Sequence, residues 1–186
     1  MTSYFAFDTE TTGLPTTRAK PQPGNIQNWD KCRVLSLAFV EFNQDHKILH
    51  ESYSLVYPDN FEVAATEIHG ITEDDAKTQG KPFEEVYQMF VDMVNVCPKV
   101  VGHNLSFDIN VLKAEAIRRN LDQTVFEKLE EVCTLKIAKD IYFKPIKLGL
   151  LYEKLMGEPL DGAHNALADA RAAGIVYHKM LGDPRV

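Results

Sequence analysis

The sequence predicts an α/β fold with a central mixed sheet of five strands flanked by helices, and three observations favour it. Three short apolar runs typical of buried strands come first, helical and strand segments then alternate, and the chain closes with helices. The length of 186 residues fits one domain spanning 1–186, and a 45% share of hydrophobic residues can form a sizeable core.

The strands are identified from short apolar runs that end at turn residues. Polar residues around His46 predict a hairpin turn between the second and the third strand. The predicted strands are Tyr4–Asp8, Arg33–Glu41, Ile48–Tyr57, Lys99–Gly102 and Val132–Ile137.

The helices are identified from apolar residues that recur every three or four positions, most clearly after Pro82. A proline at a helix start costs little, because its missing N–H has no partner there anyway. Ser106 is the predicted N-cap of the second helix. The predicted helices are Phe83–Val96, Ser106–Arg119, Leu148–Met156 and Asn165–Leu181.

An insertion separates the first two strands, from Thr11 to about Asp30. It is rich in residues that cannot continue a regular element, and it is long for a plain connection. Its role is open: it could set the length of a substrate or cover a site as a mobile lid. The residues that interrupt regular structure here are Pro15, Pro21, Pro23 and Gly24.

The net charge of −7 argues against a broadly basic coat for nucleic acid. It is compatible with an acidic site that becomes positive when divalent cations bind. Three widely spaced cysteines, Cys32, Cys97 and Cys133, argue against a zinc site and favour a reducing compartment. Neither a signal peptide nor a membrane span is recognisable, so the expected location is cytoplasmic, with no membrane partner.

The first motif with chemical meaning, Phe7–Leu14 (FDTETTGL), carries two carboxylates two positions apart. Side chains at i and i+2 of a strand share a face, so Asp8 and Glu10 should point the same way. Two hard oxygen ligands on one face suit Mg²⁺. Two ordinary acids at a solvated strand end remain the alternative.

The second motif, Gly102–Asp108 (GHNLSFD), leads from a predicted strand into a predicted helix. Asp108 falls in the first helical turn, where the helix dipole favours a negative charge. Taken alone, the motif favours a structural acid at a helix start over a functional one.

The third motif, His164–Asp169 (HNALAD), pairs a histidine with a carboxylate. On a regular helix the two would lie about 140° apart and could not face one site. Asp161 and Gly162 predict a loop, which places His164 on that loop and Asp169 on the helix. Taken alone, His164 is better explained as an exposed loop histidine without a role. Small side chains would let this helix pack closely on the sheet: Ala166, Ala170 and Ala173.

Together the three motifs resemble those of the DEDDh exonucleases, from Tyr4 to about Leu181. That superfamily includes the proofreading subunit of bacterial DNA polymerase III, repair and RNA-trimming nucleases, and viral relatives. The H-x4-D spacing of the third motif distinguishes this branch from the one that uses tyrosine. The matching positions are Asp8–Leu14, His103–Asn104, Phe107–Asp108, and His164 with Asp169.

The resemblance implies a ribonuclease H-like fold and a 3′→5′ exonuclease that acts on single-stranded DNA or RNA and releases nucleoside 5′-monophosphates. It also implies two Mg²⁺ or Mn²⁺ ions and makes His164 the general base. The implied metal ligands, which share the catalytic role with His164, are Asp8, Glu10, Asp108 and Asp169.

The resemblance further implies a set of contacts to the terminal nucleotide. Leu14 resembles a residue that wedges beside the last base, and His69 lies in Ile68–Thr72 (IHGIT), near that nucleotide in relatives. Core or turn roles for His69 and Phe107 remain open. The implied substrate contacts are Thr11, Leu14, His69, Asn104 and Phe107.

The implied reaction needs these residue types. A phosphodiester repels an attacking hydroxide, and two divalent ions about 4 Å apart overcome this by activating water and stabilising the leaving 3′ oxygen. Four crowded carboxylates could not all ionise comfortably without such cations. Imidazole titrates near neutral pH, which suits His164 as the base, and a loop position lets it move in with substrate.

Basic residues in the second half of the chain could track a nucleic-acid strand, with Tyr142 and Phe143 stacking on bases. A solvated helical face and loop explain them equally well. The residues are Arg118, Arg119, Lys136, Lys139, Lys144 and Lys147.

Two other functions stay open beside an active exonuclease. A catalytically silent nucleic-acid-binding module is disfavoured, because all five chemical positions are filled. A polymerase-associated proofreading subunit is disfavoured, because only about five residues, beginning with Gly182-Asp183-Pro184, follow the last predicted helix. They are too few for a segment that docks on a polymerase. The choice between DNA and RNA depends on contacts to the 2′-hydroxyl and stays open, as does a homodimer, which RNA-trimming relatives often form.

Overall fold

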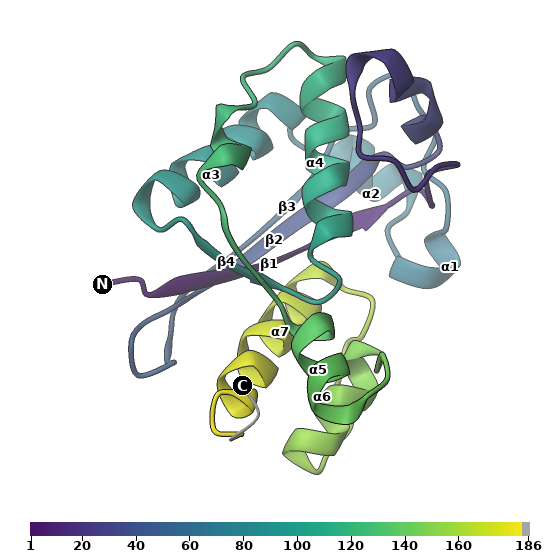
Figure 1. The fold of residues 1–186 in the computed structure, drawn as a ribbon. Coiled ribbons are helices and arrows are strands. Elements are labelled where there is room, and N and C mark those ends of the chain that lie inside the picture. The colour runs from purple at the N-terminus through teal and green to yellow at the C-terminus, as the bar shows by residue number, and fades with distance from the viewer. Residues whose placement is uncertain (184–186) are drawn as a thin grey trace.

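The structure is a computed structural model, and it describes residues 1–183. Pro184 and the last two residues of the predicted domain range lie outside the described residues. A five-stranded sheet forms the centre, in the order β3-β2-β1-β4-β5 (Figure 1). The strands are β1 (Tyr4–Thr11), β2 (Val34–Phe42), β3 (Ile48–Leu55), β4 (Lys99–Gly102) and β5 (Glu130–Cys133).

Strand pairing makes the sheet mixed, as predicted. β1 pairs antiparallel with β2 and β2 with β3, whereas β1 and β4, and β4 and β5, run parallel. β1 is therefore the strand at which the direction of pairing changes. The carboxyl ends of β1 and β4 meet at one edge, and in open α/β sheets such an edge is where ligands bind.

Helices cover both faces of this sheet (Figure 1). α3 (Phe83–Val96) and α4 (Ser106–Arg118) lie on one face, and α7 (Ala166–Met180) lies on the other with α5 (Thr134–Tyr142) and α6 (Leu148–Met156). The remaining short helices are η1 (Pro23–Trp29), α1 (Thr66–His69), α2 (Glu73–Gln79) and η2 (Thr124–Glu127).

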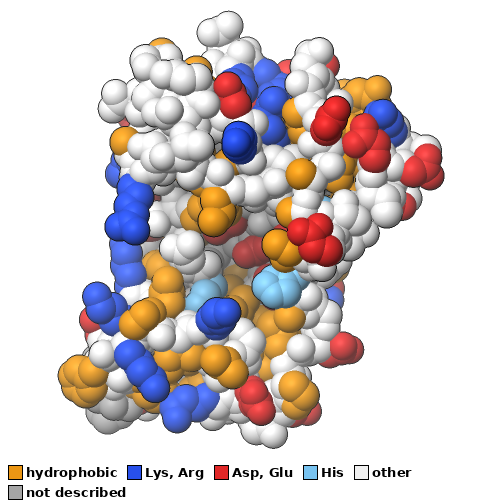
Figure 2. All heavy atoms as spheres, turned by 90° about the vertical axis from the view of Figure 1, so that its right-hand side faces the viewer, with side chains coloured by type: hydrophobic (Ala, Val, Ile, Leu, Met, Phe, Trp, Pro, Cys, Tyr) orange, Lys and Arg blue, Asp and Glu red, His pale blue; other side chains and the backbone are white. Residues whose placement is uncertain are grey.

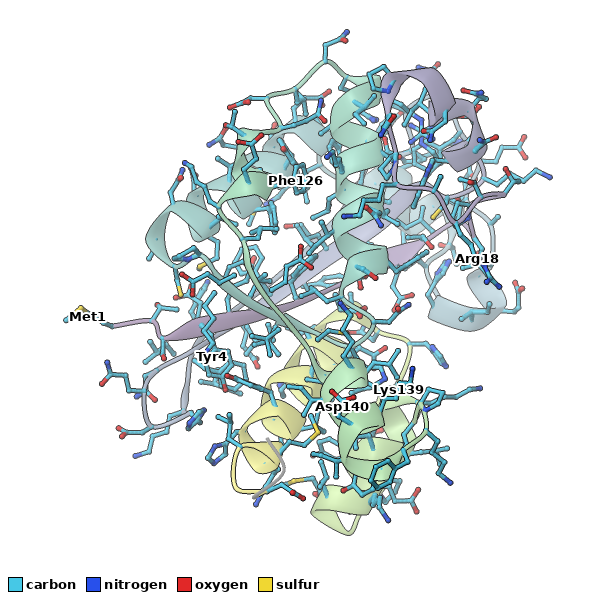
Figure 3. The ribbon with its side chains drawn as sticks, in the orientation of Figure 1. Met1, Tyr4, Arg18, Phe126, Lys139 and Asp140 are labelled. Carbon is cyan, nitrogen blue, oxygen red and sulfur yellow. The ribbon has the colours of Figure 1, made fainter. Side chains whose placement is uncertain are left out.

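The alternation of side chains along β1 divides the core in two. Phe5 and Phe7 pack with α3 and α4, while Tyr4 and Ala6 pack with α7. Figure 3 shows Tyr4 and Phe126 on opposite sides of the sheet. This alternation fixes the direction of every later side chain of β1, including the two acids.

α7 packs closely against the sheet, as its small residues predict. Ala166, Ala170 and Ala173 are buried against β1 and β2. A Cβ atom at Gly174 would lie 2.3 Å from the Phe42 ring, so only glycine fits there. Buried Ala166 and Ala170, on either side of Asp169, hold the first turn of α7 close to the sheet.

The predicted strand Val132–Ile137 is wrong from Thr134 onward. β5 ends at Cys133, and Thr134 begins α5. The apolar residues that suggested a strand recur at helical spacing, and Ala138 and Ile141 pack against α6 and α7.

Other boundaries also differ from the predictions. β1 continues to Thr11 because its backbone keeps pairing with β2, up to Val34. Ser106 is not an N-cap, since the cap position is Leu105 and no side chain caps it. The helices α1, α2 and η2 were not predicted, because each is too short to show a periodic stripe.

The insertion is packed onto the body of the protein. Trp29 and Cys32 are buried, and the Thr16 N–H donates to the Asn28 carbonyl at 2.9 Å. The short helix η1 within it lies beside α4. These contacts do not favour the mobile lid considered above.

A network of charges ties the insertion to α4. Buried Glu115 accepts hydrogen bonds from Arg33 at 2.5 Å and from Arg118 at 3.3 Å, and it also pairs with Arg119. Arg118 extends the network to Asp30, at 3.2 Å. One carboxylate thus pairs with three guanidinium groups at the junction of β2, α4 and the insertion.

Replacing Glu115 with alanine should therefore destabilise the protein by about 3 kcal/mol, because buried guanidinium groups would lose their partner. The expected drop in Tm is about 6–12 °C, measured by calorimetry or circular dichroism. Glu85→Ala, at an exposed position of α3, is the matched control. Equal Tm values for the two variants would contradict a stabilising role for the network.

Among residues 1–183, no helix is both long enough and apolar enough to span a bilayer. The three cysteines are free thiols, two of them buried.

Candidate active site

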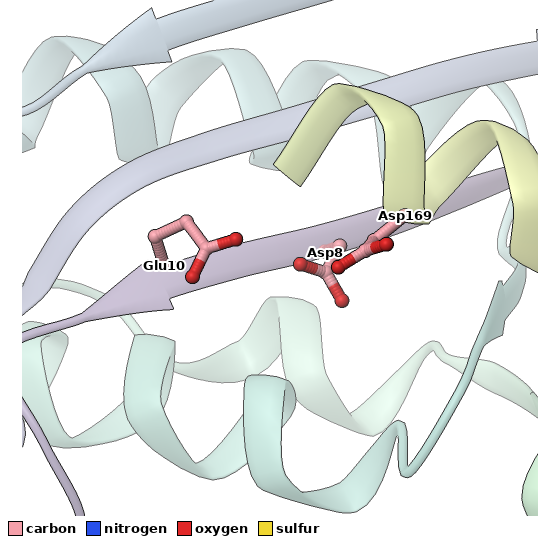
Figure 4. Close-up of side chains that lie close together, drawn as sticks. All are labelled: Asp8, Glu10 and Asp169. Carbon is pink, nitrogen blue, oxygen red and sulfur yellow. The ribbon is translucent and has the colours of Figure 1, made fainter. Parts of the chain in front are cut away.

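Three carboxylates meet at the carboxyl end of β1. Asp8, Glu10 and Asp169 each offer an oxygen atom, and these atoms lie within 4.8 Å of one another. Figure 4 shows Asp8 and Glu10 projecting from β1 on the side where α7 brings Asp169. The sequence prediction that the two acids of β1 share a face is confirmed in this geometry.

The local sequence explains how the three acids come together. Tyr4 and Ala6 face α7, so strand alternation turns Asp8 and Glu10 to the same side. Asn165 caps α7 by accepting the N–H groups of Leu167 and Ala168, at 3.1 and 3.3 Å. That cap starts the helix so that Asp169 stands in its first turn, opposite the β1 acids.

Asp108 lies near this cluster but is held by a different contact. Its side chain is buried, and Oδ1 accepts the Thr9 hydroxyl at 2.7 Å and the Thr9 N–H at 3.1 Å. Thr9 faces α4 because it alternates with Asp8 along β1. The described structure therefore joins three of the four predicted ligands in one group and fixes the fourth beside it.

The acids of this region repel one another. Burial is the main reason why the pKa of Asp8 is raised well above its usual value, and the charges of Asp108, Asp169 and Glu10 add to it. Burial first, and then the charges of Asp169 and Asp108, raise the pKa of Glu10 to about 8. Burial raises the pKa of Asp108 to about 7, although the Thr9 hydrogen bonds oppose the rise.

This cluster fits a hard divalent cation. Its donors are carboxylate oxygens, which Mg²⁺ and Mn²⁺ prefer, and their crowding makes the fully ionised state unfavourable without a cation. Asp169 follows the same pattern, because burial raises its pKa while the backbone N–H of His164 opposes that rise.

The stability of the metal-free protein should accordingly fall as pH rises. When the pKa of a carboxyl group is raised in the folded state, the folded protein loses stability as the pH rises from the unfolded pKa to the folded pKa. For Glu10 these values are 4.5 and about 8. Glu10→Gln removes this loss. Since Glu10 is partly exposed, we expect a discounted gain at pH 8 of about 1–2 kcal/mol, or 2–8 °C in Tm.

The measurement is the Tm of both proteins in chelator from pH 4.5 to pH 8.5. The two curves should converge at the acidic end, and added Mg²⁺ or Mn²⁺ should raise the wild-type Tm more than that of the variant. A Tm difference that is the same at every pH would mean that the charge of Glu10 is not its cause.

His164 stands on the loop before α7, as predicted. It is exposed, has a left-handed backbone with φ of 65°, and donates its N–H to Asp169 Oδ2 at 3.1 Å. This bond holds the backbone of the loop at the carboxylates while the imidazole faces solvent. Figure 2 shows acidic side chains recessed at the centre of this face and histidine side chains at the lower edge of the recess.

The residues expected at the terminal nucleotide have mixed surroundings. Leu14 is 74% exposed beyond the end of β1, and exposed Asn104 has a left-handed backbone with φ of 65°. The Thr11 hydroxyl donates to the Gly13 carbonyl at 3.0 Å, and Phe107 packs partly against the core. Leu14 and Asn104 thus have side chains open to a ligand.

His69 has a structural environment. It is buried, its Nδ1 accepts the Ile71 N–H at 3.0 Å, and its Nε2 lies 2.9 Å from the Ala64 carbonyl. Both ring nitrogens are therefore occupied by the backbone of the α1 turn. A contact from this ring to a nucleotide would use its edge or would act through the turn that it holds.

The arrangement of acids at the end of β1 agrees with a family assignment. Residues 5–177 match the family model RNase_T, described as exonuclease. The chain belongs to this exonuclease family. Its five-stranded mixed sheet with helices on both faces is the ribonuclease H-like fold of these enzymes.

Relatives of this exonuclease chain occur within larger proteins. It is 29% identical, over 98% of its length, to the PolC-type DNA polymerase III of Streptococcus pyogenes serotype M18, of which it spans 11%. E. coli exonuclease I in complex with a dT13 oligonucleotide has a TM-score of 0.75 at 18% identity, covering all of this chain and 42% of that one.

A second solved structure is similar over nearly its whole length. Exonuclease X in complex with 5′ overhanging duplex DNA has a TM-score of 0.68 at 20% identity, covering 97% of this chain and 92% of that one. At these identities the structural likeness establishes the fold, and the chain spans less than half the length of the PolC-type polymerase and of exonuclease I.

Two residues of this exonuclease site had no role in the sequence predictions. Thr9 holds Asp108, as described above, and strand alternation could have indicated it. His103 bonds through Nδ1 to the Thr134 hydroxyl at 2.9 Å and through Nε2 to the Ile146 carbonyl at 3.0 Å. It thus ties the start of α5 and the α5–α6 connection to the end of β4, a contact that no local pattern predicts.

Proposed function

We propose that this chain is a 3′→5′ exonuclease domain, formed by residues 1–186, that releases nucleoside 5′-monophosphates from single-stranded ends. The observation that carries the proposal is the convergence of Asp8, Glu10 and Asp169, with oxygen atoms within 4.8 Å, beside an exposed loop histidine. Family membership supports the exonuclease activity. The 3′→5′ direction rests on the resemblance of the three motifs.

In this proposal Asp8, Glu10 and Asp169 hold divalent cations, two Mg²⁺ or Mn²⁺ ions when the site is filled, with Asp108 as the fourth ligand. Such ions, when bound, neutralise phosphate charge, activate the attacking water and stabilise the leaving 3′ oxygen. Asp108 contributes the Oδ2 side of its carboxylate, because Thr9 occupies Oδ1.

His164 acts as general base. The exposed imidazole accepts the proton of the attacking water, while the backbone N–H of His164 stays bonded to Asp169. His164 precedes α7 and is exposed, so a turn of its side chain towards substrate requires no movement of the helix.

The terminal nucleotide lies against Thr11, Leu14, Asn104 and Phe107, with His69 supporting that side through its turn. Leu14 is exposed enough to wedge beside the last base. Single-stranded ends are the proposed substrate because exonuclease I was solved with oligonucleotides such as dT13 and dA16, and exonuclease X with 5′ overhanging duplex DNA.

The test follows 5′-labelled single strands of DNA and RNA of one sequence over time with Mg²⁺ or Mn²⁺, beside a chelator control. A ladder that shortens by single nucleotides from the 3′ end supports the proposal and identifies the preferred nucleic acid. Products that begin at the 5′ end, or internal cuts, would refute the proposed direction. Binding without any products would favour a silent nucleic-acid-binding module.

Proofreading for a polymerase is a second proposal about the same activity, favoured by the similarity to PolC-type DNA polymerase III. It predicts faster removal of a mismatched than of a matched 3′ end, because a mismatched end frays into a single strand. A cytoplasmic location and a homodimer remain predictions, the former supported by three free thiols.

A further inference from the structure

A groove opens directly beside the carboxylates. It measures about 850 Å³, and Asp169 and His164 line its inner end. From there it runs along the start of α6 to the α5–α6 connection, where Pro145, Lys147 and Leu150 line it. This volume lies within the range of about 300–1,000 Å³ in which proteins hold small organic groups.

The groove lies apart from most of the residues proposed to hold the terminal nucleotide. Thr11, Leu14, His69 and Phe107 are not among its lining residues, whereas Asn104 lines it together with His164 and Asp169. The groove therefore shares Asn104 with the proposed contacts of the terminal nucleotide and otherwise has a lining of its own.

The chemistry of the groove suits bases and phosphates together. Most of its lining side chains are apolar, among them Leu148, Leu150 and Leu160, and Leu150 is 60% exposed. The charged side chains of Lys147 and Glu153 also line the groove. Figure 2 shows hydrophobic and basic side chains mixed on the lower part of this face, below the histidines.

Phe143 stands two residues before the lining residue Pro145 and has an unusual conformation. It ends α5 with a left-handed backbone, φ of 58°, which is unfavourable for a bulky residue, and its side chain is 88% exposed. The side chain therefore takes no part in the core. Exposed aromatic rings beside lysines are the usual platforms for bases of single strands.

We propose that this groove holds the nucleotides immediately 5′ of the scissile phosphate, with Leu150 under a base, Phe143 stacking on the next and Lys147 pairing with the connecting phosphate. Its volume accommodates about one or two nucleotides. The inference rests on the proposed exonuclease function and adds a requirement for a single strand of several nucleotides.

His103 makes the groove rigid. Its ring joins Thr134 of α5 to the Ile146 carbonyl, so the wall of the groove is fixed to the end of β4, from which the catalytic edge also starts. A strand seated in the groove is thereby held at a set distance from Asp169. This explains how contacts beyond the terminal nucleotide would position the scissile bond.

The test compares substrates that do and do not reach the groove. The 4-nitrophenyl ester of thymidine 5′-monophosphate carries one nucleoside, whereas a thymidine octanucleotide fills both sides of the carboxylates. Phe143→Ala and Leu150→Ala should lower kcat/KM on the octanucleotide about 10-fold, mainly through KM, and on the ester about 2-fold or less. Phe143→Trp should restore the octanucleotide value.

Lys147→Ala should reduce the slope of log affinity against log salt by about 0.7 for the single strand. Val96→Ala, which removes a side chain that is 72% exposed on α3, is the matched control and should change neither substrate. Equal losses on ester and octanucleotide, or no loss on either, would overturn the proposal.

Anisotropy of a labelled octanucleotide separates this inference from the proposed activity. Should the wild type hydrolyse neither substrate, the exonuclease proposal fails, and binding still tests the groove. Weaker binding by Phe143→Ala than by Val96→Ala then supports the groove, and equal binding refutes it.

Discussion

Asp8→Asn should reduce kcat by about a thousandfold or more while the fold survives. Stabilisation of transition-state charge by bound cations contributes several kcal/mol, and each 1.4 kcal/mol is about tenfold in rate. The charges of Glu10 and Asp169 both act on the carboxyl group of Asp8 and raise its pKa. Its loss should therefore weaken cation binding as well as turnover.

The measurement combines a time course on a 5′-labelled single strand with calorimetric titration of Mn²⁺. Asp45→Asn, an exposed aspartate of the β2–β3 hairpin, is the control and should behave as the wild type. Full activity of Asp8→Asn would refute the assignment of the metal site.

Stability gives the same variant a second, independent signature. Burial and like charges raise the pKa of Asp8, so asparagine relieves an unfavourable charge at neutral pH. We expect the metal-free variant to melt no lower than the wild type. A collapsed Tm would instead mean that lost activity reflects lost structure.

Features that depend on neighbouring residues in the sequence could be predicted, whereas features that depend on distant residues could not. Strand alternation is local, and it correctly aligned Asp8 with Glu10. The turn signal of Asp161 and Gly162 is also local, and it correctly put His164 on a loop before α7. The order of three strands followed by alternating helices and strands correctly predicted a mixed sheet, whereas the order of the strands within it was not predicted.

What the sequence could not indicate depends on distant partners. Thr134 begins a helix instead of continuing a strand because α5 packs on α6 and α7, which come later in the chain. Asp108 is held by Thr9, 99 positions away, and this pairing needs the register of β1 against α4. The groove beside Asp169 arises only when α6 and the loop before α7 meet.

His164→Ala should lower kcat by about 10²–10⁴-fold, the usual contribution of a general base, while cation affinity changes little. The reason is that the backbone and the side chain of His164 have separate roles. The backbone N–H of His164 bonds to Asp169 at 3.1 Å and survives the substitution, whereas the imidazole is exposed and makes no ligand contact in the group of Asp8, Glu10 and Asp169.

The pH profile distinguishes a base from a structural residue. A general base gives kcat an ascending limb with pH, and this limb should vanish in His164→Ala. His178→Ala, at an exposed position of α7, is the control and should keep the wild-type profile. Loss of Mn²⁺ affinity in His164→Ala would make the imidazole a ligand, and an unchanged profile would transfer the role of base to another group.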